Sequence, residues 1–189
     1  MLTMKDIIDD NNPKIREISK EVTLPLSTED KQLLQDMYTF LVQSQDEKLS
    51  EKYDLRPAVG IAAIQLGIPK RMCAIYVVDY DEDGNPISNS SYALVNPKII
   101  KYTQKPSHLR DGEGCLSVNY ECTGIVPRHA KITVESYDLL QDKVVRIVAR
   151  GFLSICMQHE FDHFEGTLFY DHINKEDPFA PIENAMIID

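Results

Sequence analysis

The segment Gln158-His159-Glu160-Phe161-Asp162-His163 is the part of the chain that decides its fold. It contains the pattern His-Glu-x-x-His, which runs from His159 to His163. On an α-helix, residues four apart lie one above the other on the same face. Two imidazoles at this spacing can bind one metal ion, and Glu160 between them can reach a water on that ion. The segment therefore predicts a metal site on a helix.

The surrounding residues favour a buried helix. No Pro or Gly occurs from Phe152 to Phe164, and Gly166 is a natural helix stop. Apolar residues occur on nearly every side of this helix, which is typical of a helix in the core. Two His and one Glu are costly there without partners, and a metal ion would supply partners for all three. The alternative is a chance match to a short pattern, and the apolar setting argues against it.

Composition limits the class of protein. A chain of 189 residues with 43% hydrophobic and 26% charged residues is expected to form one globular domain, residues 1–189. No apolar run approaches ~20 residues and the first residues lack a signal-like pattern, so neither a membrane partner nor export is expected. Four cysteines without a Cys-x-x-Cys pattern indicate reduced thiols in the cytoplasm. The net charge of -10 argues against direct nucleic-acid binding.

Hydrophobic periodicity predicts helices near the N-terminus and strands in the middle of the chain. Apolar residues at helical spacing predict a helix over 28–45, with Ser27 as its N-cap, and Pro13 begins a short helix through Ile15 and Ile18. A surface loop or weak helix is expected over 46–56, and a tight turn leading into a helix over 57–67. Strands are expected over 71–80, 92–100, 125–127, 130–137, 143–150 and 185–188, with a turn over 81–86 and a hairpin formed by 130–137 and 143–150.

The third protein ligand distinguishes the enzyme classes. A catalytic zinc-type site has three protein ligands and one open position. One protease class continues the pattern as His-Glu-x-x-His-x-x-Gly-x-x-His, which would place the third ligand at Phe169, a residue that cannot bind a metal. A second protease class takes a Glu from a later helix. The candidate here is Glu183, which lies in a tail that is not expected to form a helix. Cys115 directly follows Gly114, where a metal can approach closely, although a lone Cys is by default a small buried thiol. Cys156 can line the same site.

Three stretches together resemble the signature motifs of the peptide deformylase family. They are Gly60–Gln65, Glu113–Ser117 and Gln158–His163, and the resemblance extends over nearly the whole chain. The length and the strand-like tail are similar to those of the longer, second type of bacterial deformylase. The first motif departs from the family pattern at Ala58, where Gly is usual, and at Ile64, where Pro or Thr is common. These departures affect the rim of the substrate site and leave the candidate ligands unchanged.

The resemblance implies an α+β fold in which antiparallel β-sheets pack around the central metal-binding helix, with helices near the N-terminus. It implies removal of the formyl group from N-formyl-methionyl nascent polypeptides, and it allows a transient contact with the ribosome. Cys115, His159 and His163 would hold one divalent metal ion per chain. The family usually works with ferrous iron, and a His₂Cys site also suits zinc, nickel or cobalt.

The resemblance also implies roles for the residues around the metal. Glu160 would move the proton of the attacking water, while the side-chain amide of Gln65 and the backbone N–H of Leu116 would stabilise the oxyanion. Glu113 would pair with Arg128 and brace the ligand loop. The alternative for this pair is a surface ion pair that contributes little to stability.

The substrate-binding residues implied by the resemblance flank the metal. The peptide would lie as an extended strand along Val59 and Gly60, and Ile155 and Cys156 would form walls of the methionine pocket. Two other functions remain open. A general zinc endopeptidase is disfavoured by the missing downstream ligand, and a non-enzymatic protein with a closed metal site would need a fourth ligand that is not evident.

Overall fold

The computed structural model describes residues 1–189, and its larger sheet is antiparallel throughout. The strand order is β1-β2-β3-β6-β7, with bounds Gly60–Ala62, Met72–Tyr80, Pro86–Tyr102, Lys131–Asp138 and Lys143–Arg150. Strands β6 and β7 form the expected hairpin. The long strand β3 shifts register twice against β6, beginning after Val95, and Asn96 there takes a left-handed conformation at φ 50°. These irregularities bend the sheet.

The smaller sheet has three strands in the order β5-β4-β8, with bounds Arg128–His129, Pro106–Leu109 and Met186–Ile188. Strands β4 and β5 are antiparallel, whereas β4 and β8 are parallel. The C-terminal strand was predicted, but its partner β4 was not. A four-residue strand that begins at Pro106 carries too few residues to show a strand pattern.

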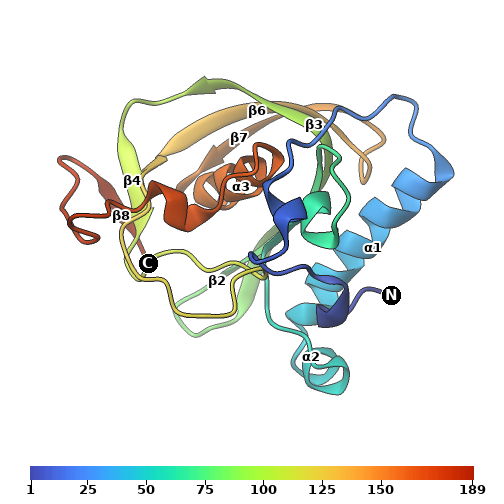
Figure 1. The fold of residues 1–189 in the computed structure, drawn as a ribbon, viewed down its shortest axis with the longest axis horizontal. Helices are drawn as coiled ribbons and strands as arrows, with labels where there is room; N and C mark the ends of the chain where they lie inside the picture. The colour runs from blue at the N-terminus through green and yellow to red at the C-terminus, as the bar shows by residue number, and fades with distance from the viewer.

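Helix α3 (Gly151–Phe164) lies in the middle of the molecule, between the two sheets (Figure 1). Helix α1 (Thr28–Ser44) covers strand β2 on one side, and β4 and β8 lie on the other (Figure 1). The apolar side chains of Met157, Phe161 and Phe164 are buried in the same core cluster as residues of β2, β6 and β7. The predicted arrangement of sheets around a central buried helix is therefore confirmed.

The local sequence accounts for the N-terminal helices. Ser27 caps α1 by accepting a hydrogen bond from the Asp30 N–H at 3.1 Å, as the cap pattern predicted. Residues 46–56 contain a short helix, α2 (Glu47–Tyr53), in agreement with a weak helix. The remaining helical turns are of the 3-10 type, namely η1 (Met4–Asp6), η2 (Pro13–Arg16), η3 (Ala63–Leu66) and η4 (Phe169–His172).

No helix is both long and apolar enough to span a bilayer.

Three local predictions were wrong. Residues 57–67 were expected to form a tight turn leading into a helix, but Gly60–Ala62 pair with β2 as strand β1, and only the 3-10 turn η3 follows. The short helix was expected to pass through Ile15 and Ile18, but η2 ends at Arg16 and the backbone of Glu17 is extended. Ile15 is fully buried, whereas Ile18 is 60% exposed, because the two residues do not share a helical face. Residues 125–127 do not form a strand; the strand begins at Arg128, directly after Pro127, which has no N–H to donate.

Candidate active site

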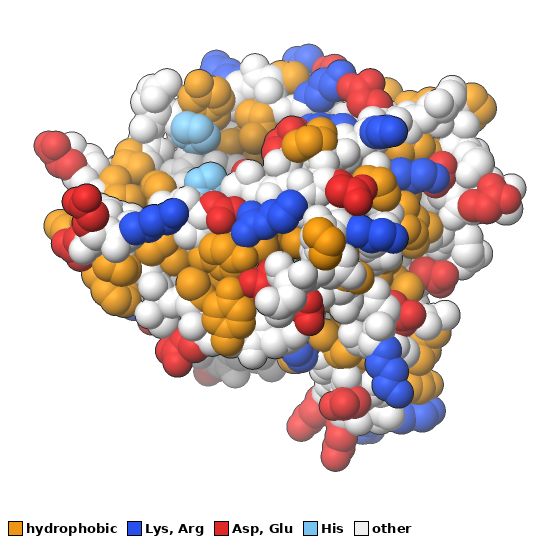
Figure 2. Space-filling view, viewed as in Figure 1, with side chains coloured by type: hydrophobic (Ala, Val, Ile, Leu, Met, Phe, Trp, Pro, Cys, Tyr) orange, Lys and Arg blue, Asp and Glu red, His pale blue; other side chains and the backbone are white.

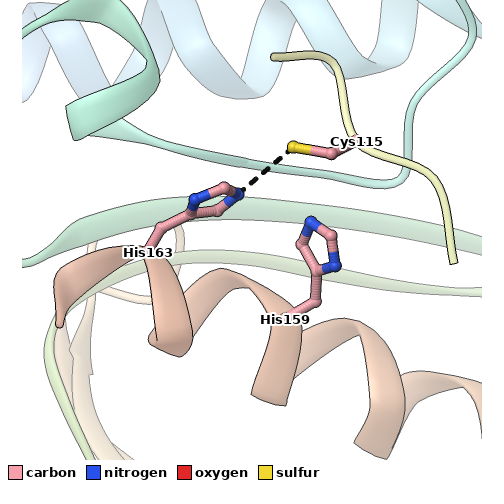
Figure 3. Close-up of side chains that lie close together, drawn as sticks. All are labelled: Cys115, His159 and His163. Atoms are coloured by element: carbon pink, nitrogen blue, oxygen red, sulfur yellow. Dashed lines mark hydrogen bonds between the residues drawn. The ribbon is translucent and has the colours of Figure 1, made fainter. Parts of the chain in front are cut away.

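The structure brings the three expected ligands together. His159 and His163 project from α3, and Cys115 reaches them from the loop after β4 (Figure 3). Their candidate ligand atoms all lie within 4.8 Å of one another, and Cys115 Sγ is 3.5 Å from His163 Nε2. Around a tetrahedral ion with metal–sulfur and metal–nitrogen bonds of about 2.3 and 2.0 Å, these two atoms would be about 3.5 Å apart. The donor set therefore fits a divalent metal ion.

The protonation of Cys115 also suits a ligand. Burial opposes the thiolate, but the adjacent imidazoles of His163 and His159 outweigh it and hold the pKa of Cys115 well below its ordinary value. Burial and the nearby Glu160 raise the pKa values of Cys73 and Cys156 well above the ordinary value. A thiolate is the form that binds metals. Among the three buried cysteines, only Cys115 is held in that form.

A chain of ion pairs, buried at Glu113 and Arg128 and partly exposed at Asp162 and His172, orients His159. Glu113 Oε2 lies 2.8 Å from His159 Nδ1, which leaves the other ring nitrogen to face the ligand cluster. Arg128 binds Glu113 through two hydrogen bonds of 2.8 and 2.9 Å, and only 3% of either side chain is exposed. Arg128 also contacts Asp162, which pairs with His172 at 2.7 Å. The pair of Glu113 and Arg128 is thus a buried brace and not a surface ion pair.

Glu160 is buried and lacks a full set of partners. Its Oε2 atom has no hydrogen bond within the chain, and neither has Nδ1 of His163. Burial raises the pKa of Glu160 to about 7, and the nearby Cys115 and Glu113 add to this effect while the two imidazoles oppose it. A Cβ atom at Gly60 would overlap the Glu160 carboxylate, so only Gly leaves room for it. A carboxylate that titrates near neutral pH can accept and return a proton.

Two hydrogen-bond donors flank the ligand sulfur. Gln65 is 1% exposed; its Oε1 accepts from the Ala62 N–H at 2.8 Å, and its Nε2 points to Cys115 Sγ at 3.4 Å and Ser117 Oγ at 3.3 Å. The N–H of Leu116 makes no hydrogen bond within the chain. Sequence reasoning missed Ser117, although it belongs to the same motif as Cys115.

A pocket of about 510 Å³ opens beside this cluster. All four predicted substrate-binding residues line it, namely Val59, Gly60, Ile155 and Cys156. Sequence reasoning did not assign Phe152, Leu109 or Arg56 to the pocket walls. Phe152 could have been found, because it precedes Cys156 by four residues on the face of α3 that carries the ligands. The other two come from separate loops and strands, and no local pattern indicates their position.

Similarity to known proteins agrees with this geometry. Residues 4–179 match the family described as polypeptide deformylase. The chain is 48% identical to a peptide deformylase of Macrococcus caseolyticus over 189 residues, covering 100% of both chains, and 46% identical to peptide deformylase 2 of Bacillus cereus, covering 98% and 97%.

Solved structures lead to the same family. The crystal structure of peptide deformylase from Ehrlichia chaffeensis is similar with a TM-score of 0.71 and 28% identity, covering 90% of this chain and 88% of that one. A Met-Ala-Ser-bound peptide deformylase from Acinetobacter baumannii has a TM-score of 0.68 and 26% identity, covering 88% and 96%. The chain belongs to the polypeptide deformylase family.

Proposed function

We propose that this chain hydrolyses the formyl group from the N-terminal methionine of newly made polypeptides and releases formate. The observation that carries the proposal is the convergence of Cys115, His159 and His163, beside a pocket that Cys115, His159 and the buried Glu160 line. The three ligand residues would hold one divalent metal ion, which supplies a Lewis acid for the formyl oxygen and lowers the pKa of the attacking water. Ferrous iron is our proposal for the native metal.

Glu160 is the proposed proton carrier. Its carboxylate takes the proton of the attacking water and delivers it to the leaving amine. Burial raises the pKa of this carboxyl above its ordinary value, which makes it a better proton acceptor for the attacking water than an exposed carboxylate would be. Its free Oε2 atom is available for this transfer.

Gln65 and Leu116 are the proposed oxyanion donors. The hydrogen bond from Ala62 fixes the orientation of the Gln65 amide, and the Leu116 N–H has no competing acceptor. Donors that are already in place stabilise the negative charge of the transition state without reorganisation. Gln65→Leu should therefore lower kcat by about 10²–10³-fold with little change in metal content, as measured by formate release and metal analysis.

The substrate is proposed to bind as an added strand. Strand β1 lies at the edge of the larger sheet, and Val59 and Gly60 line the pocket. Main-chain pairing reads little of the side-chain sequence, which suits a substrate set of many different proteins. The methionine side chain enters the apolar part of the pocket, between Ile155, Cys156 and Phe152. We place this activity in the cytoplasm, on nascent chains, with a transient ribosome contact.

A comparison of three substrates tests the proposal. Formyl-Met peptides should release formate, whereas matching acetyl-Met peptides should react little, because the additional methyl group must enter a closely packed site at a cost of about 1–3 kcal/mol. Unstructured protein should not be cleaved internally. The assay uses metal-loaded protein kept free of oxygen. Comparable internal cleavage would favour a zinc endopeptidase, and inactivity on all three substrates would favour a non-enzymatic protein.

A further inference from the structure

The loop that carries Cys115 is held by a side chain outside the three family motifs. Arg56 follows α2, and its guanidinium points at this loop from the rim of the pocket. Its Nη1 donates to Leu116 O at 3.2 Å and to Asn119 Oδ1 at 3.0 Å, and its Nη2 donates to Cys115 O at 3.2 Å and Val118 O at 3.5 Å. No carboxylate pairs with Arg56. Its charge is therefore directed at the carbonyl groups of one turn.

The backbone on both sides of Arg56 is constrained. Helix α2 ends at Asp54 in a left-handed conformation with φ 52°. Leu55 is 6% exposed, and its N–H donates to Ser50 O at 2.9 Å. Pro57 follows and restricts Arg56 to extended conformations. The guanidinium thus starts from a fixed point, although the side chain itself is exposed.

The bond from Arg56 to Cys115 O bears directly on Leu116. The C=O of Cys115 and the N–H of Leu116 belong to the same peptide plane and point in opposite directions. Cys115 O also accepts from the Val118 N–H at 3.2 Å, which closes a turn. Two donors on one oxygen fix the rotation of this plane, and the cation polarises the amide. The Leu116 N–H is therefore held facing away from Arg56 and is made a better donor.

The geometry points to Arg56 as a positioning residue for the oxyanion donor Leu116. This inference rests on the proposed deformylase function and adds a residue to it. Arg56 contacts neither the ligand atoms nor Glu160; it acts through the peptide plane between Cys115 and Leu116. Removing the guanidinium would let this plane rotate and weaken a donor that is used in the transition state. Its effect should therefore appear in kcat rather than in KM.

The test replaces Arg56 by Met, which keeps the apolar stem and removes the donors. Arg56→Met should bind a normal amount of metal. Its kcat should be about 10–100-fold lower than that of the wild type, a smaller loss than removing a whole oxyanion donor would cause. Its KM should change by less than about threefold. Arg56→Lys should also lose activity, because one ammonium group cannot reproduce a planar fork. Arg146→Met on β7, an exposed arginine outside the pocket, is the control and should match the wild type.

Two further measurements separate positioning from other roles. Guanidinium added at millimolar concentration should partly restore kcat in Arg56→Ala and have no effect on Arg146→Met. Formyl-Met-Ala and formyl-Met-Ala-Ser should lose kcat equally, whereas a rise in KM confined to the longer peptide would assign Arg56 to substrate binding and overturn the inference. Wild-type kcat in Arg56→Met, or in Arg56→Lys if the Met variant fails to fold, would also overturn it. An inactive wild type would overturn the proposed function as well.

Discussion

The two sides of α3 differ in how completely their polar groups are paired. On the side away from the pocket, Gln158 accepts from the His129 N–H at 2.9 Å and donates to His129 O at 3.0 Å, and Asp162 pairs with Arg128 and His172. On the pocket side, the buried Oε2 atom of Glu160 has no hydrogen-bond partner within the chain. Both sides carry polar groups in the core of the protein.

This difference distinguishes the side of α3 that supports the fold from the side that faces the candidate active site. An unpaired buried carboxylate oxygen costs free energy, and beside the candidate ligands it marks a position that a reaction can use. The paired side holds the helix and orients His159 through Glu113, while the pocket side is free to bind a metal and a substrate. The outer surface shows no such division: in Figure 2, acidic and basic side chains are intermixed on the face turned to the viewer.

The largest effect is expected from removing a ligand on the pocket side. Losing a residue that only orients a metal ligand lowers metal affinity by up to about 100-fold. Cys115→Ala removes a candidate ligand itself, so it should weaken metal binding by more than this and abolish formate release. Cys73→Ala and Cys122→Ala should retain their metal, because neither thiol belongs to the ligand cluster. Metal analysis after gel filtration provides the measurement. A fully occupied site in Cys115→Ala would remove Cys115 from the ligand set.

Replacing Glu160 should separate catalysis from metal binding. Glu160→Gln keeps the shape of the side chain but cannot accept a proton, so kcat should fall by about 10²–10⁴-fold or more while metal content is unchanged. Formate release and metal analysis on the same sample make the comparison. Loss of metal from this variant, with activity preserved in any fraction that keeps it, would make Glu160 a ligand instead.

On the paired side, the expected effect is on stability. Arg128→Met leaves the buried carboxylate of Glu113 and the partly exposed one of Asp162 without their guanidinium partner, so the free energy of unfolding should fall by about 3–5 kcal/mol. Metal affinity should also fall, by about 10–100-fold, because His159 loses its fixed orientation. Urea unfolding measures the first effect. The exposed pair of Arg146 and Glu135 provides the control, and breaking it should cost no more than about 1 kcal/mol.

The smallest effect is expected from pH. The pKa of Glu160 is raised to about 7, so its carboxylate form is lost as pH falls through that value, and a bound cation moves the midpoint lower. Below the midpoint, kcat/KM should fall about tenfold per pH unit. Arg128 and His159 outweigh burial and hold the pKa of Glu113 below its ordinary value of 4.5, so the stability that Glu113 contributes is full above pH 4.5 and is lost only as pH falls further.

A pH series of activity and of unfolding checks this separation. Activity should decline at a higher pH than stability does, because the two carboxylates have opposite shifts in pKa. Coincident transitions in activity and unfolding would mean that protonation of the paired side controls both.

Local patterns predicted the elements that depend on near neighbours. The apolar periodicity of α1 and its Ser27 cap arise from contacts within a few residues, the hairpin of β6 and β7 joins two strands that follow each other directly in the chain, and the structure contains all three. The short strand β4, by contrast, is defined by its pairing with β5 and β8, which are far away in the chain. Its own four residues carry no repeating pattern.

The sequence by itself indicated Glu160 and the two candidate His ligands, because one helical turn places them near one another whatever surrounds the helix. It also narrowed the third candidate ligand to Cys115 once the motifs were considered jointly. Only the tertiary structure decided that Glu113 and Arg128 form a buried brace and that Arg56 faces the Cys115 turn. These contacts join residues from separate segments, and burial, which determines how strongly charges interact, is a property of the whole fold.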